Sequence, residues 1–223
     1  MRICRSCLIV QLPEYVSPDE IFREYAYFSS FSDSWVEHAR QFADTMIDLL
    51  GLGPESRVVE VASNDGYLLR HFVARGVPVL GVDPARNVAE AARAQDVPIV
   101  AEFFGVPLAE SLLATNGPAD LIVANNVYAH VPDLYAHGPD LHDLTGGFAV
   151  LPAPGGTLSI EFPHLVRLVE GNQFDTIYHE HFRVGGMAGT AGTDRQRRSL
   201  PGPGPIARQA TSLARNAVHR DNA

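Results

Sequence analysis

The chain has 223 residues, 46% of them hydrophobic, and a formal net charge of -9 at pH 7. This length accommodates one complete α/β domain with appendages but no second full-sized domain, since domains usually run to roughly 100–200 residues. The acidic balance excludes general nucleic-acid binding, which needs a basic face, and no apolar run approaches the roughly 20 residues of a membrane span. Because the N-terminal MRICRSC also lacks the apolar core of a signal peptide, we expect a cytoplasmic protein with no membrane partner.

The N-terminal segment holds the only two cysteines, Cys4 and Cys7, in a C-x-x-C spacing. They can supply two thiolates to zinc, but a structural zinc site normally has four ligands. Two inert thiols, the remnant of a zinc module and a redox pair all stay open as interpretations. The redox pair is the least favoured because no strand-helix unit surrounds the motif. The metal prediction is therefore a zinc half site.

Residues 36–50 predict a lead-in helix that packs on a sheet, because their apolar residues recur at helical spacing. The predicted stripe consists of Val36, Ala39, Phe42, Ala43, Met46, Leu49 and Leu50. Nearly continuous apolar runs, as expected of buried parallel strands, then occur at 57–62, 77–82, 97–104, 120–126 and 157–162. Helical stretches separate them at 67–74, 85–95, 107–114 and, more loosely, 133–151. This alternation predicts an α/β fold with a Rossmann-like, doubly wound and mainly parallel sheet.

The most specific local signal is VVEVASNDGYLL, a strand that ends in a turn of small residues and leads directly into a helix. In doubly wound sheets, ligands bind at the carboxyl ends of the strands. Glu60 and Asp65 can favour a cationic amino acid moiety there, and the turn around Ser63 and Gly66 lets the backbone approach it. Asp83 closes the next strand, where an acid can bind ribose hydroxyls.

A nicotinamide dinucleotide would use the same acid, so the first turn must distinguish the two cofactors. The dinucleotide motif G-x-G-x-x-G sets a helix N-terminus against a pyrophosphate. This turn has one glycine and two acidic neighbours, which would repel a pyrophosphate. S-adenosyl-L-methionine carries a sulfonium and an ammonium group, so the sequence favours it over NAD.

Residues 183–223 differ in composition from the rest of the chain. They contain six Gly, three Pro and seven Arg against two Asp, with no aromatic residue and no apolar periodicity. Segments of this kind cannot bury enough apolar surface to fold. We expect a disordered tail.

Motifs in a fixed order carry a resemblance to one family: CRSCLIVQLPEY, YFSSFSDSWVEHA, EVASNDGYLL, NNVYAHVPD, IEFPHL and QFDTIYHEHF. Over residues 4–182 the chain resembles the nucleotide-sugar C-methyltransferases of deoxysugar biosynthesis, class I enzymes that use S-adenosyl-L-methionine. The resemblance implies an N-terminal zinc module, a central cofactor domain and a C-terminal domain. We expect this chain to hold a partial zinc module (1–34), the cofactor domain (35–182) and a tail (183–223), truncated at both ends, with a reading-frame shift as one explanation of the tail.

The resemblance also assigns site residues. It places around the cofactor Glu60, Ser63, Asp65, Gly66, Asp83, Asn125 and Asn126, with Phe104 near the adenine. It gives the reacting centre Tyr178, Glu180 and His181 from the YHEH motif, joined by His130 from AHVPD. The implied substrate is a nucleotide-linked keto sugar, and the expected oligomeric state is a monomer.

Methylation of carbon requires removal of a proton beside the ketone to give an enolate, and a histidine suits this step because its pKa lies near 6.5. We expect His181 to be the base, Glu180 or Tyr178 to orient it or bind sugar hydroxyls, and His130 to donate to the enolate oxygen. Metal ligation by residues 179–181 is an alternative, although neighbours at i and i+2 converge poorly. An O- or N-methyltransferase and an inactive cofactor-binding remnant are the rival functions.

Overall fold

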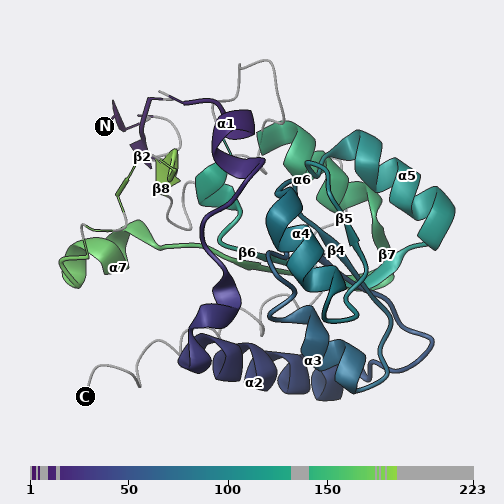
Figure 1. The fold of residues 1–223 in the computed structure, drawn as a ribbon. Helices are drawn as coiled ribbons and strands as arrows, with labels where there is room; N and C mark the ends of the chain where they lie inside the picture. Colours follow the sequence, from purple (N-terminus) through teal and green to yellow (C-terminus); the bar gives the residue numbers. More distant parts are fainter. Residues whose placement is uncertain are drawn as a thin grey trace.

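The computed structural model describes residues 2–3, 5, 10–13, 16–131, 141–173, 175, 177–178 and 180–184. At its centre lies a parallel sheet of five strands in the order β5-β4-β3-β6-β7, with helices on both faces (Figure 1). Its strands are β3 (Val58–Val61), β4 (Val79–Val82), β5 (Ile99–Val100), β6 (Ala119–Asn125) and β7 (Pro152–Glu161). The predicted doubly wound α/β fold is confirmed.

The helices form two layers that bury the two faces of the sheet. One layer consists of α2 (Asp33–Leu50), α3 (Leu69–Ala74) and α4 (Arg86–Arg93); the other consists of α5 (Val106–Asn116) and α6 (Leu141–Val150). In Figure 1, α2 and α3 run below the sheet, and α5 and α6 lie above it. Side chains of a strand alternate between these layers: Val58 packs with the first, and Val59 with the second.

The lead-in helix begins three residues earlier than its apolar stripe predicts. Ser32 caps α2 by accepting a hydrogen bond from the backbone N–H of Trp35, and Gly51 ends the helix with a positive φ of 64°. Ala39, Ala43 and Met46 of the stripe are buried, but Leu49 is 41% exposed. The prediction that Leu49 faces the core was therefore wrong. This residue lies in the last turn of the helix.

Two other boundaries differ from the sequence expectation. The apolar run at 97–104 forms only the two-residue edge strand β5, because beyond Val100 the chain leaves β4. The loose helical region becomes α6, which begins at Leu141, while residues 132–140 lie outside the described residues.

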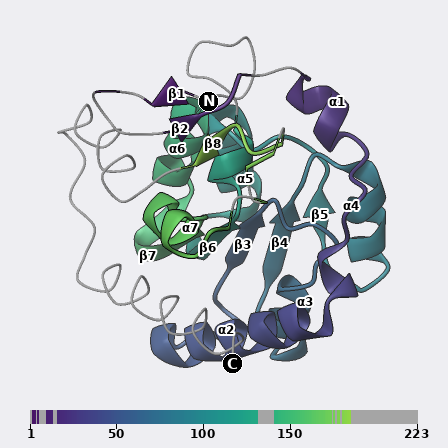
Figure 2. The same ribbon diagram turned by 90° about the vertical axis from the view of Figure 1, so that its left-hand side faces the viewer.

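A second, small antiparallel sheet joins the two ends of the described chain. It consists of β1 (Arg2–Ile3), β2 (Val10–Gln11) and β8 (Arg183–Val184), and it lies at the end of the molecule opposite to α2 (Figure 2). Short helices α1 (Pro18–Phe22) and α7 (Leu165–Glu170) and the 3-10 turns η1 (Ser29–Phe31) and η2 (Tyr128–His130) complete the fold. The described structure therefore continues two residues into the expected tail; residues 185–223 lie outside it.

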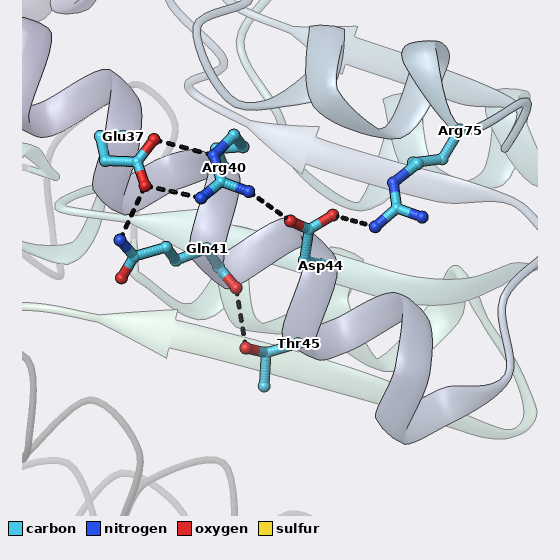
Figure 3. Close-up of polar contacts among 6 residues, drawn as sticks. All are labelled: Glu37, Arg40, Gln41, Asp44, Thr45 and Arg75. Carbon is cyan, nitrogen blue, oxygen red and sulfur yellow. Dashed lines mark hydrogen bonds and ion pairs between the residues drawn. The ribbon is translucent and has the colours of Figure 1, made fainter.

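An exposed ion-pair network ties α2 to the end of α3 (Figure 3). Arg40 contacts Glu37 at 2.6 Å and Asp44 at 2.7 Å, and Asp44 also pairs with Arg75. The Arg40 hydrogen bond holds the pKa of Glu37 down at about 2.

No helix among the described residues combines the length and the apolar composition of a membrane span.

Candidate functional site

The middle of the sheet contains a topological switch point. From β3 the chain adds β4 and β5 on one side, and then returns to place β6 and β7 on the other. The connections after β3 and β6 therefore diverge to opposite faces at the carboxyl ends of these strands, and ligands bind at this place in sheets of this kind. The predicted cofactor turn, 62–66, lies at this edge.

This turn adopts a conformation that requires its small residues. Ala62, Asn64 and Gly66 all have positive φ, at 57°, 49° and 78°. A Cβ atom on Gly66 would lie 3.0 Å from Cγ2 of Val97, so both its φ and its surroundings favour glycine. Strained backbone of this kind clusters at functional sites.

Glu60 projects from β3 into the base of this site. Its side chain is 0% exposed, and neither carboxyl oxygen accepts a well-formed hydrogen bond from any described residue. Burial raises the pKa of Glu60 well above its usual range, and the carboxylates of Asp83 and Asp65 raise it further; the Tyr67 hydroxyl offsets part of this effect. A carboxyl buried in this way has room for a cationic partner, because buried charges in proteins are normally paired.

Asp83, at the end of β4, has both oxygens engaged by backbone groups. One accepts from the N–H of Asn64 and the other from the N–H of Ala85, each at 2.9 Å. Burial nevertheless raises the pKa of Asp83 to about 6. Asp83 thus fixes the turn after β3, and a ribose hydroxyl would have to share these oxygens as a further donor.

Ser63 and Asp65 leave two more buried polar atoms without a hydrogen-bond partner among the described residues, Oγ of Ser63 and Oδ1 of Asp65. The other oxygen of Asp65 accepts from the backbone N–H of Ser30 at 3.1 Å and from the Ser30 hydroxyl. Gly81 makes room for Ser63, because a Cβ at residue 81 would lie 2.5 Å from its Oγ.

These unpartnered atoms test whether the site fits the expected cofactor. Three acceptor side chains, Glu60, Ser63 and Asp65, are buried at one strand end, and their unsatisfied oxygens would accept hydrogen bonds from an ammonium group. Burial, and after it the neighbouring carboxylates, raise the pKa of Glu60, and a bound cation would offset both effects. These acceptor side chains therefore fit the ammonium group of S-adenosyl-L-methionine.

The remaining cofactor candidates occupy different surroundings. Phe104 is 5% exposed and packs its ring against Phe148 at a centroid distance of 5.2 Å, inside the second core layer. Asn125 is the last residue of β6, and its side chain contacts the Tyr67 hydroxyl. Asn126 follows with a positive φ of 57° and donates its N–H to the Glu161 carbonyl at 2.8 Å. The two asparagines lie at the carboxyl end of β6, and Phe104 packs in the second core layer.

The four predicted catalytic residues come together in space. His181 is 8% exposed. The centroid of its ring lies 4.3 Å from the ring centroid of Tyr178 and 4.8 Å from that of His130. His130 Nδ1 lies 3.0 Å from the backbone carbonyl oxygen of Glu180. Burial raises the pKa of Tyr178, so its hydroxyl stays protonated at neutral pH.

The contact with Glu180 decides the tautomer of His130. Burial and the neighbouring His181 lower the pKa of His130 to about 4, so the ring is neutral at pH 7. A carbonyl oxygen only accepts, so the single ring proton lies on Nδ1, and Nε2 is an acceptor. In this tautomer Nε2 of His130 can accept a proton, and the role in stabilising an enolate oxygen stays a prediction.

The predicted metal ligands lie outside the described residues, both for the zinc half site at Cys4 and Cys7 and for His179 of the H-E-H alternative. Among the described residues, no group of three or more His, Cys, Asp and Glu side chains is arranged to hold a metal ion.

Sequence reasoning missed the residues that cover the cofactor turn from the N-terminal side. Asn64 accepts from the Ser29 N–H at 3.0 Å and donates to the Tyr27 carbonyl at 3.0 Å, while Ser30 contacts Asp65. These contacts span 35 to 37 positions, so no local periodicity indicates them. The only signal was the serine pair at 29–30, which is polar in an otherwise aromatic segment.

Comparison with known proteins identifies the family and the fold. Residues 35–185 match the family model described as a methyltransferase domain, and the chain belongs to this family. Its fold is that of the class I methyltransferases that depend on S-adenosyl-L-methionine. Over 180 residues the chain is 37% identical to the C-methyltransferase NovU of Streptomyces niveus, an alignment that covers 81% of this chain and 41% of NovU. The chain thus spans about two fifths of the length of this relative.

Two solved structures resemble the fold. A SAM-dependent methyltransferase from Archaeoglobus fulgidus superposes with a TM-score of 0.55 at 15% identity, over 73% of this chain and 69% of that one. The YcgJ protein from Bacillus subtilis gives a TM-score of 0.53 at 17% identity, over 73% and 68% of the two chains. At these identities the likeness shows the fold alone.

Proposed function

We propose that this chain supplies the cofactor site and reacting centre of a methyltransferase that methylates a carbon atom of a nucleotide-linked 4-keto deoxysugar through an enolate. The observation that carries the proposal is the clustering of His130, Tyr178, Glu180 and His181 in a chain whose residues 35–185 match a methyltransferase domain. The 37% identity to a C-methyltransferase supports transfer to carbon.

Each cofactor residue has a role that follows from its contacts. Glu60, Ser63 and Asp65 would hold the ammonium group through their unsatisfied oxygens. Asp83 would take the ribose hydroxyls while holding the turn in place. When bound, S-adenosyl-L-methionine supplies an activated methyl group on a positively charged sulfur.

Two histidines can accept the proton from the sugar carbon. His181 is the base favoured by the sequence, and it lies against Tyr178, whose protonated hydroxyl can donate to the developing enolate oxygen. His130 is neutral with an acceptor at Nε2, which makes it the second candidate base. Orientation of the enolate toward the methyl group accounts for much of the rate in such a transfer.

Deuterium exchange at the sugar carbon tests this function and separates the two bases. With the demethylated cofactor product bound, the chain should exchange the proton beside the ketone of a nucleotide-4-keto sugar although no methyl group can move. His181→Ala should slow exchange roughly 10²–10⁴-fold, the usual contribution of a positioned base. Exchange at the parental rate in His181→Ala, with loss in His130→Ala, would transfer the role to His130.

The rival functions give different results in the same assay. An O- or N-methyltransferase needs no carbon acid, so it would bind cofactor without exchanging a carbon-bound proton. A non-catalytic remnant would bind cofactor and show neither exchange nor methyl transfer.

A further inference from the structure

The chain segment 23–30, which we name the N-terminal strap, connects the cofactor turn with the reacting centre. At its start, the Arg23 carbonyl accepts from the N–H of Arg86 at 3.1 Å. At its end, Ser29 and Ser30 bond to Asn64 and Asp65 of the turn. The strap is therefore fixed at both ends to elements that form the cofactor site.

Tyr25 in the middle of the strap is clamped by one side chain. Its backbone N–H donates to Oδ1 of Asn87 at 3.0 Å, and its carbonyl accepts from Nδ2 of the same asparagine at 2.7 Å. Asn87 lies in the first turn of α4, four residues after Asp83. This double hydrogen bond fixes the backbone of Tyr25 relative to the carboxyl end of β4.

The side chain of Tyr25 reaches the reacting centre. Its hydroxyl donates to Oε2 of Glu180 at 3.3 Å, across 155 positions of sequence. Burial and the carboxylates of Glu180 and Asp83 raise the pKa of Tyr25, so the hydroxyl keeps its proton and acts as a donor. Phe22 packs against the rings of both Tyr25 and His130, at 5.8 Å and 5.3 Å.

We propose that Tyr25, clamped by Asn87, is a positioning residue that fixes Glu180 and, through the Glu180 carbonyl, the ring orientation and tautomer of His130. The contacts form a chain: Asn87 holds the Tyr25 backbone, the Tyr25 hydroxyl donates to the Glu180 carboxylate, and His130 Nδ1–H donates to the Glu180 carbonyl. Only the catalytic consequence of this inference rests on the proposed function.

The tautomer of His130 can be measured without activity. In long-range ¹⁵N–¹H spectra of the full chain, with His130 assigned by loss of its signals in His130→Gln, the parent should show the proton on Nδ1. Tyr25→Phe removes only the hydroxyl and should shift this ring toward a mixture of tautomers, and Asn87→Ala should do the same. Asp19→Asn is the control, because it breaks the exposed ion pair with Arg23, the first residue of the strap, without touching Tyr25 or Glu180.

The catalytic consequence is measured by the exchange assay. At saturating sugar, Tyr25→Phe should slow exchange about tenfold, the scale of one hydrogen bond to a charged group, with the cofactor Kd unchanged. Tyr25→Phe in a Glu180→Ala background should add little, because the tyrosine acts through Glu180. A His130 spectrum unchanged by Tyr25→Phe overturns the proposal, as does a fully additive double variant. If the parent does not exchange at all, the proposed reaction fails, whereas the spectra still decide the role of Tyr25.

Discussion

The backbone N–H of Asn64 donates a 2.9 Å hydrogen bond to the carboxylate of Asp83, which ties the turn after β3 to the end of β4. The other oxygen of Asp83 accepts from Ala85, so one side chain orders two loops. A ligand that binds across both loops meets a surface already held in place.

Asp83→Ala should therefore weaken binding of S-adenosyl-L-methionine for two reasons, loss of the ribose acceptor and loosening of the turn. We expect a decrease of roughly 1–3 kcal/mol in binding free energy by isothermal titration, the scale for a polar group that loses its partner. Asp120→Ala is the matched control. Asp120 also accepts a backbone hydrogen bond, from the N–H of Arg57 at 2.8 Å, but it lies at the amino-terminal ends of the strands, away from the cofactor turn. Equal affinities of the Asp83 variant and the parent would remove Asp83 from the site.

Glu60→Gln should stabilise the free chain and weaken its cofactor binding. Burial raises the folded-state pKa of Glu60, so above the unfolded value of about 4.3 the unfolded chain loses a proton that the folded chain retains, and stability falls as the pH rises. The amide removes that cost, and we expect a gain of roughly 1–3 kcal/mol in unfolding free energy at pH 7 that shrinks toward pH 4. Cofactor affinity should fall roughly ten- to a hundredfold.

Denaturant unfolding at several pH values checks the stability effect of Glu60→Gln, with the exposed Glu55→Gln as a control that should change neither quantity. A variant that is both less stable and unchanged in affinity would show that Glu60 is a structural residue with a partner of its own.

The layered core could be predicted from sequence because its signals are local. Each buried strand is an apolar run. These runs also locate Glu60, which lies within β3, and Asp83, which directly follows β4. The strap contacts could not be predicted, because Tyr25 meets Glu180 across 155 positions and Asn87 across 62. The tautomer of His130 depends on a backbone carbonyl 50 residues away, which no residue pattern encodes. Long-range hydrogen bonds of this kind are decided by how the loops pack once the sheet has formed.

Gly66→Ala should destabilise the chain more than Gly155→Ala. Both glycines have positive φ, 78° and 81°, so both substitutions place an L side chain in the left-handed region at a cost of about 1–2 kcal/mol. Gly155 has open space around it, whereas a Cβ on Gly66 presses against Val97. Thermal unfolding should show the larger loss for Gly66→Ala, accompanied by weaker cofactor binding, and Gly155→Ala should leave binding intact. Identical losses would show that Val97 yields without strain.

Asp44→Asn should lower the unfolding temperature slightly at low ionic strength and have little effect in 1 M salt. Asp44 bridges Arg40 of its own helix and Arg75 beyond α3, but the side chains lie at the surface, where salt screens their attraction (Figure 3). Arg167→Gln breaks an isolated exposed pair with Glu170 and should have the smaller effect. A salt-independent loss in Asp44→Asn would indicate packing rather than charge.

His130 should make the stability of the chain fall as the medium is acidified from about pH 6.5 to pH 4. Its folded-state pKa is lowered to about 4, chiefly by burial, while the unfolded value is near 6.5, so in this range the unfolded chain binds the extra proton. The contribution is present in full above pH 6.5 and is lost as the pH falls toward 4, by on the order of 1–3 kcal/mol. His130→Gln should flatten this part of the curve, whereas His142→Gln, exposed on α6, should not. Parallel curves for His130→Gln and the parent, measured by denaturant unfolding, would show that His130 is protonated with equal ease in both states, and the neutral tautomer inferred for the reacting centre would fail with it.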